Sequence, residues 1–179
     1  MVVAPPRDVW ETIAFEAEHE SGLWAQALRP PGERETEAVF SPLGEERYAL
    51  GLETIYEGYL LHYGRPRLFA PADRDTGLLL GDYLYAHGLV RVAEAGTVEA
   101  VADLAELISL CAQLQAEGTA GDGAAWAASA ALLGRGELEQ ARATLRDGQD
   151  PGVLDGLARG VAGDGPVERT LAAHDRRVR

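Results

Sequence analysis

Asp82 places a carboxylate inside the apolar run GLLLGDYLYAHG. A carboxylate on an apolar helix is costly unless it is paired or hydrogen-bonded. Asp82 is therefore expected either to act in a site or to meet a basic partner, with Arg65, Arg67 and His87 as the candidates. Gly81 precedes it, and a glycine in a helix interior costs on the order of 1 kcal/mol relative to alanine. Such a glycine indicates a close backbone approach or a site.

The loop upstream of this helix carries a second candidate chemistry. Arg65 and Arg67 flank Pro66, which stiffens the loop. Guanidinium forks match phosphate oxygens, so the two arginines are candidates for binding a diphosphate. The alternative is that they are ordinary surface arginines without a site.

Two segments together resemble the trans-polyprenyl diphosphate synthase family. Gly64-Arg65-Pro66 lies seventeen residues before Gly81-Asp82. In that family an arginine-rich G-x-P loop leads into a helix that carries G-D-x-L. The helix expected from Thr97 to Glu117 also resembles the family's next helix. The resemblance covers about Glu53 to Glu117, and it implies an all-α helical bundle similar to part of the isoprenoid synthase fold.

The resemblance also identifies a candidate metal site. The family's D-D-x-x-D motif aligns with ETIYE, which keeps the outer carboxylates as Glu53 and Glu57 and has Thr54 second. The two glutamates lie one helical turn apart on one face. Mg²⁺ needs several convergent oxygens, so the resemblance implies only a degenerate site of Glu53, Glu57 and Asp82. The alternative for both glutamates is the solvated edge of an acidic helix.

Other family signatures are missing. No second D-D-x-x-D occurs after Gly118, and the G-K-R signature is absent because the sequence has no lysine. These departures favour a protein without catalytic residues and without metal ligands. Mg²⁺ would be required only if an enzyme activity persists. In that family the G-D-x-L helix and its successor lie near a large apolar subunit interface. The chain is therefore expected to form a homo-oligomer, or a heteromer with a catalytic synthase.

Composition narrows the class of protein further. The 179 residues carry a net charge of −13, and all sixteen basic residues are arginine. An acidic surface repels phosphate backbones, which argues against a nucleic-acid partner. Cys111 is the only cysteine, which suits a reducing compartment. No signal peptide or membrane-spanning run is visible, so a cytoplasmic location is expected.

Hydrophobic periodicity predicts an all-α fold. The expected order is a helix over Val9–Leu28, a short helical piece over Glu33–Phe40, three long helices and four shorter Ala-rich helices. The long helices are expected at Leu43–Tyr63, Asp73–Ala95 and Thr97–Glu117, and the short ones at Ala124–Leu133, Glu137–Arg146, Pro151–Val161 and Pro166–Arg176. The helix over Asp73–Ala95 is apolar nearly all round, which predicts a central buried element.

The domain organisation follows from the same pattern. Residues 1–118 are expected to form the main bundle, and residues 119–179 to pack on it without being an independent domain. The segment LLGRGELEQARATL resembles half of a tetratricopeptide-type hairpin, but no second copy follows at a fixed period.

Three functions remain open from the sequence. The first is a non-catalytic, prenyl-synthase-like subunit in polyprenyl diphosphate biosynthesis, with a prenyl or diphosphate ligand. The second is an all-α adaptor that binds a protein partner. The third is a Mg²⁺-dependent prenyl transferase with an altered metal site.

Overall fold

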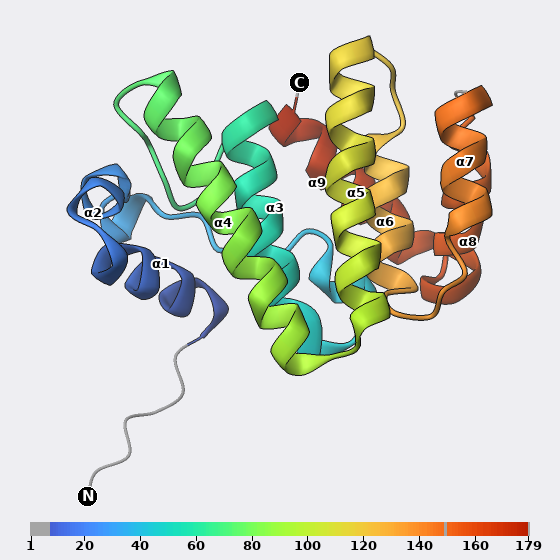
Figure 1. Ribbon diagram of the computed structural model, residues 1–179, viewed down its shortest axis with the longest axis horizontal. Coiled ribbons are helices and arrows are strands. Elements are labelled where there is room, and N and C mark those ends of the chain that lie inside the picture. The colour runs from blue at the N-terminus through green and yellow to red at the C-terminus, as the bar shows by residue number, and fades with distance from the viewer. Residues whose placement is uncertain (1–7, 149, 179) are drawn as a thin grey trace, which may run out of the picture.

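The computed structural model describes residues 8–148 and 150–178, and within them the chain is mostly helical, with no strand. The α-helices are α1 (Val9–Glu20), α2 (Gly22–Ala27), α3 (Ala49–Tyr63), α4 (Arg74–Ala95), α5 (Val98–Glu117), α6 (Asp122–Ala131), α7 (Glu139–Gly148), α8 (Gly152–Ala162) and α9 (Asp164–Val178). Three 3₁₀ turns join them, at Pro31–Glu33, Ser41–Leu43 and Glu46–Tyr48. The predicted all-α class is confirmed (Figure 1).

Local capping signals explain where several helices begin. The Asp73 side chain accepts a hydrogen bond from the Thr76 N–H at 2.8 Å, and α4 starts at the next residue. The Thr97 hydroxyl accepts from the Ala100 N–H at 3.3 Å at the start of α5. Each cap satisfies a backbone donor that has no partner inside its helix.

Two expected helices differ in the structure. The helix predicted over Val9–Leu28 is interrupted at Ser21, whose hydroxyl accepts from the Trp24 N–H and starts α2. The segment Glu33–Phe40, predicted to be helical, instead runs as an irregular strap after Glu33. The backbone N–H of Glu35 donates to the Arg67 carbonyl at 3.2 Å, so tertiary partners replace the helical hydrogen bonds there.

Helices α3 and α4 form an antiparallel pair with glycines facing each other. A Cβ at Gly58 would lie 2.9 Å from the Gly81 carbonyl oxygen, and one at Gly88 would lie 3.1 Å from that of Gly51. These distances leave no room for a side chain, so the glycines set how closely the two helices approach. Gly81 therefore marks a close backbone approach, one of the two alternatives that its position in the helix indicated.

The outer face of α4 is not covered. Leu80 and Leu84 are buried, but Leu79 is 58% exposed and Val90 is 55% exposed. The prediction that this helix is buried nearly all round is therefore wrong for that face. Its apolar composition comes in part from side chains that meet solvent.

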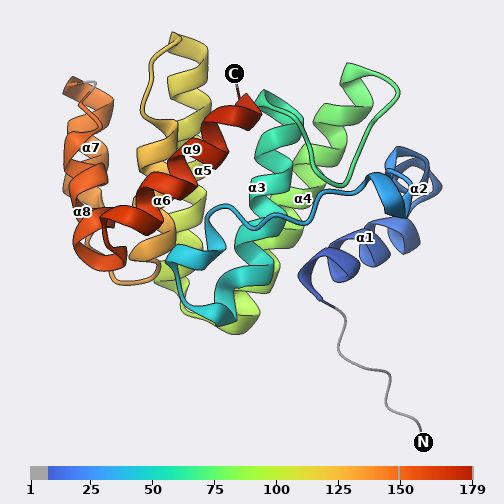
Figure 2. The same ribbon diagram turned by 180° about the vertical axis from the view of Figure 1, so that it is seen from behind.

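Beyond α4 the chain forms two neighbouring helical hairpins. Helices α5 and α6 make the first and α7 and α8 the second; α7 lies beside α5, and α8 packs on α6 (Figure 1). Helix α9 crosses the back of α6 and reaches α3 (Figure 2). One large core contains side chains from both sides of Gly118, including Leu104, Trp126 and Leu154. A smaller core lies under α1 and α2.

Candidate functional site

Three of the predicted site residues form a single buried ionic cluster. The Arg67 guanidinium donates through Nε to Glu57 Oε2 at 2.9 Å and through Nη1 to Glu53 Oε2 at 2.6 Å. The side chains are 0–1% exposed. The guanidinium also lies over the Trp10 ring, 4.6 Å from its centroid, and over the Tyr56 ring at 5.0 Å. Two carboxylates and the faces of two aromatic rings therefore surround this cation.

The same carboxylates hold two loops on α3. Glu57 Oε1 accepts the backbone N–H groups of Arg67 and Leu68, each at 2.7 Å. Glu53 Oε1 accepts those of Val39 at 3.3 Å and Ser41 at 3.1 Å. Every carboxylate oxygen of the two glutamates therefore has a donor. The cluster satisfies itself, as buried charges must.

This geometry corrects several expectations for these residues. Glu53 and Glu57 are not a solvated edge, and the Arg67 guanidinium occupies the place between them where a metal ion would bind. Arg67 itself is enclosed, so it is not placed to meet a diphosphate. Arg65 is exposed, and its Nη2 donates to the Arg176 carbonyl at 2.5 Å. The two arginines therefore do not act together.

Asp82 lies apart from that cluster. Its side chain is 70% exposed, and its Oδ1 lies 3.1 Å from His62 Nε2 on α3. The predicted partners Arg65, Arg67 and His87 are not the groups it meets. The His62 ring stacks on Tyr85 with centroids 5.1 Å apart, and a Cβ at Gly81 would lie 2.7 Å from that ring. The Gly81-Asp82 pair therefore accommodates and contacts His62.

The carboxylates do not converge on a metal site. Across residues 8–148 and 150–178, no group of three or more His, Cys, Asp or Glu side chains is arranged to hold a metal ion. The expected grouping of Glu53, Glu57 and Asp82 is thus not present in this geometry, because Arg67 separates the glutamates from solvent and Asp82 faces outward on α4.

A buried polar network joins helices that are distant in sequence. Asp122 Oδ2 accepts from the Tyr59 hydroxyl at 2.5 Å and lies 3.0 Å from His174 Nε2. The other ring nitrogen of His174 lies 2.9 Å from the Tyr56 hydroxyl. Burial alone would raise the pKa of Asp122, but the hydrogen bonds from His174 and Tyr59 lower that pKa to about 2. This network links α3, α6 and α9.

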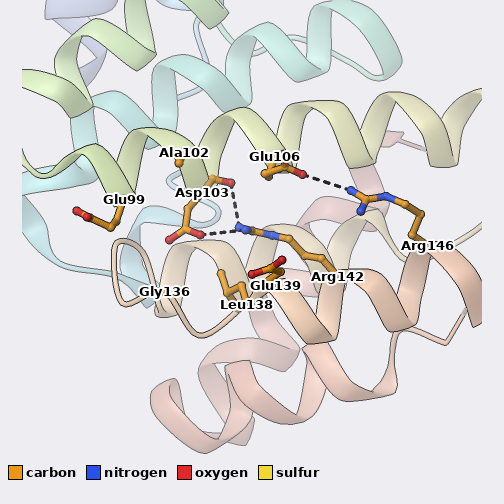
Figure 3. A pocket seen from close by; sticks show the side chains of 9 residues that line it. All are labelled: Glu99, Ala102, Asp103, Glu106, Gly136, Leu138, Glu139, Arg142 and Arg146. Carbon is orange, nitrogen blue, oxygen red and sulfur yellow. Dashed lines mark hydrogen bonds and ion pairs between the residues drawn. The ribbon is translucent and has the colours of Figure 1, made fainter.

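An open pocket lies between α5 and α7 (Figure 3). Its volume is about 410 Å³, which is within the range of ligand-binding clefts. Four acidic and two basic side chains line it together with small or apolar residues; the full lining is Glu99, Ala102, Asp103, Glu106, Gly136, Leu138, Glu139, Arg142 and Arg146. Four carboxylates against two guanidinium groups leave a net charge of −2.

A nearly buried ion pair forms the floor of this pocket. Arg142 Nη1 donates to Asp103 Oδ1 at 2.9 Å, and both side chains are nearly buried. Asp103 Oδ2 accepts the Gly134 N–H at 2.8 Å, and Arg142 Nη2 donates to the Asp103 carbonyl at 2.9 Å. Arg142 Nε has no acceptor within the described part of the chain. The bridge ties α7 to α5 and fixes the separation of the two walls.

The charged side chains at the rim of the pocket are exposed to solvent. Arg146 Nη2 lies 3.3 Å from Glu106 Oε2 in an exposed pair. Glu139 is exposed and extends between the walls, and in the described residues no hydrogen bond or ion pair reaches its carboxylate (Figure 3). Glu99 lies at the start of α5, where the backbone N–H of the first turn and the Thr97 side chain lower the pKa of its carboxyl.

The pocket was not predicted from the sequence. Its charges occupy the polar sides of two amphipathic helices, a pattern that is typical of solvated faces. Only the juxtaposition of α5 and α7 gathers them. The spacing of Glu139, Arg142 and Arg146 places them on one face of α7. It does not indicate which helix that face packs against.

Comparisons with family models, with curated proteins and with solved structures found no match. Among the described residues, no helix has both the length and the apolar character needed to cross a membrane.

Proposed function

We propose that this protein is a helical adaptor that binds a basic segment of a partner protein in the groove between α5 and α7. The observation that carries the proposal is the pocket of about 410 Å³ with four carboxylates in its wall, of which Glu139 has no partner in the described residues. An unpaired acid in a concave site attracts a cation more strongly than one on a convex face, because the low-dielectric walls focus its field.

The charge of the whole protein also favours a basic partner. The whole chain carries a net charge of −13, which steers basic partners toward it and repels acidic ones. The Asp103–Arg142 bridge joins the two walls of the groove and sets their separation. A preformed site loses little conformational entropy on binding. We place the interaction in the cytoplasm, as the cysteine content predicts.

A peptide library of graded net charge tests this proposal. Immobilised peptides that bind should be rich in arginine and lysine, and their binding should weaken as salt rises. Glu139→Lys should abolish the binding, because it reverses the charge of the acid in the groove that has no partner in the described residues. The matched control is Glu11→Lys, which reverses an exposed acid in the first turn of α1, at the opposite end of the molecule (Figure 1).

Either of two results contradicts the adaptor proposal. One is a set of bound peptides that are neutral or acidic. The other is binding that survives Glu139→Lys as well as it survives Glu11→Lys, which would place the partner on another surface.

A second candidate function is a partner subunit of a trans-polyprenyl diphosphate synthase, built on a bundle that resembles part of the isoprenoid synthase fold. Exposed Leu79 and Val90 on α4 favour it, since they lie three turns apart on one face of the helix that carries the G-D-x-L resemblance. Co-expression with a full-length synthase tests it. Co-purification that is lost in Leu79→Asp but kept in Glu11→Lys supports this role, and no co-purification contradicts it.

A further inference from the structure

We infer that the outer face of α4 is a second docking surface, and that it takes an amphipathic helix with basic flanks from a partner protein. The inference goes beyond the proposed function, because it concerns a different part of the surface from the groove between α5 and α7. It follows from the apolar side chains on this face, from the carboxylates beside them and from the positions of the α4 arginines.

The apolar side chains of this face form one line along the helix. Leu79 and Val90 are each more than half exposed, and Ala86 between them is exposed as well. Tyr83 is half-buried, and its ring lies 5.8 Å from that of Trp24 on α2. The four α4 residues follow the spacing i, i+4, i+7, i+11, which keeps them on one face over about 16 Å. Helix α4 lies in front of α3 in Figure 1, and none of the other described helices crosses it there.

Exposed carboxylates border this apolar line along its length. Asp75 precedes Leu79 by four residues, and Glu94 follows Val90 by four, while Asp82 lies between the two pairs. Residues four apart are neighbours on a helix surface. Within the described residues, no hydrogen bond or ion pair reaches the carboxylates of Asp75 and Glu94. A partner on this face would therefore meet apolar side chains and negative charge together.

Neither arginine of α4 neutralises these acids. Arg74 comes five residues before the first apolar side chain of the line, which places it about 140° round the helix. Arg91 donates to Glu16, and its side chain is only 10% exposed. His87, at the edge of the face, has the same carboxylate beside it, with Nδ1 3.8 Å from Glu16 Oε2. The cations of this helix are thus either turned away from the face or already beside an acid.

This combination selects one kind of partner. The backbone groups of α4 are hydrogen-bonded within the helix, so the face offers side chains alone, and a second helix packs along such a line of anchors. Arginine or lysine beside the partner's own apolar residues would meet the carboxylates. A second copy of this chain is disfavoured, because it would bring three carboxylates of each copy against those of the other. The same acids repel an anionic membrane surface.

Three acetylated and amidated fifteen-residue peptides test the inference, each titrated into the full chain by calorimetry. The first has leucine at positions two, six, nine and thirteen, arginine at positions three, five, ten and twelve, and alanine elsewhere. The second has the same composition with the leucines distributed round the helix, and the third has glutamate in place of arginine. The first should bind roughly tenfold more tightly than either of the others, because it alone combines an apolar line with basic flanks.

Serine substitutions locate the bound peptide. Leu79→Ser combined with Val90→Ser should weaken binding of the first peptide roughly tenfold, since apolar area is lost without a change of charge. The matched control is Val153→Ser combined with Val161→Ser on α8, two exposed valines at the right-hand end of the molecule in Figure 1. The control should bind the peptide as the wild type does. Neither double variant removes a buried side chain, so both should fold.

The outcomes separate this inference from the groove. Equal affinity for the first peptide and either of the others would overturn it, as would equal losses in the two double variants. Binding that is lost in Glu139→Lys but kept in the α4 double variant would place the peptide between α5 and α7, which overturns the inference and leaves the adaptor function standing. Failure of every basic peptide of the library, with binding of the first peptide to α4 intact, would do the reverse. A dimer in light scattering that the α4 double variant dissociates would make a second copy the occupant and would also overturn the inference.

Discussion

Replacing Arg67 with methionine should destabilise the protein severely. The substitution removes the cation from between Glu53 and Glu57 and leaves two carboxylates in a site whose side chains are 0–1% exposed. Breaking a buried pair by removing one partner costs about 3–5 kcal/mol. Natural domains are stable by about 5–15 kcal/mol, so Arg67→Met should lose a large share of the stability and would be marginally folded at the low end of that range.

Urea unfolding followed by circular dichroism measures this loss. The control is Arg65→Met, which removes an exposed guanidinium with one hydrogen bond to a backbone carbonyl and should cost less than about 1 kcal/mol. Trp10 stacks on Arg67, so its fluorescence should change only in the first variant. If Arg67→Met is too unstable to purify, its loss is at least the full stability of the wild type, and a second background shows whether the two glutamates cause that loss.

That background carries Glu53→Gln and Glu57→Gln together. The amide oxygens can still accept the loop N–H groups, while no charge remains for Arg67 to neutralise. Adding Arg67→Met in that background should cost clearly less stability than it does in the wild type. The difference between the two costs is the coupling energy between Arg67 and the two glutamates. Similar losses for Arg67→Met and Arg65→Met in the wild type would refute a buried ionic cluster and would restore Arg67 as a candidate ligand residue.

Further predictions test the helix packing, the polar network and the charged rim. Gly58→Ala should lower the melting temperature because its Cβ would lie 2.9 Å from a carbonyl, whereas Gly156→Ala, with nothing within 4 Å, should raise the stability by about 0.5–1 kcal/mol. The lowered pKa of Asp122, about 2 against an ordinary 3.8, contributes about 2 kcal/mol at neutral pH. That contribution is complete above about pH 4 and lost as pH falls toward 2, so the stability gap to Asp122→Asn should shrink over that window in acid titrations. Arg146→Ala should tighten binding of basic peptides modestly by freeing Glu106.

The helices with strong local signals were predictable. Asp73 and Thr97 each cap the helix that follows, and both helix starts predicted from them lie within one residue of the observed starts. Helix propensity and capping act within a few residues, so a single sequence contains the information. The strap after Glu33 was not predictable in this way, because its backbone partners are Arg67 and Glu53, which lie far along the chain.

The sites depended on contacts between distant residues. In the sequence, Glu53 and Glu57 have the pattern of a solvated acidic edge of a helix. Only the folded chain brings Arg67 against them. Tyr56 and His174 are 118 residues apart, and no local pattern links them. The groove between α5 and α7 likewise arises only when two polar helix faces meet. Sequence spacing identified several of the residues with unusual environments but not the groups that surround them.

Mapping a bound peptide by NMR tests the groove most directly. Adding an arginine-rich peptide from the library to isotope-labelled protein should shift the backbone amide signals of residues 99–106 and 136–146, and these shifts should be absent in Glu139→Lys. Shifts that cluster on α4 around Leu79 and Val90, or no shifts at all, would contradict a basic-segment site between α5 and α7.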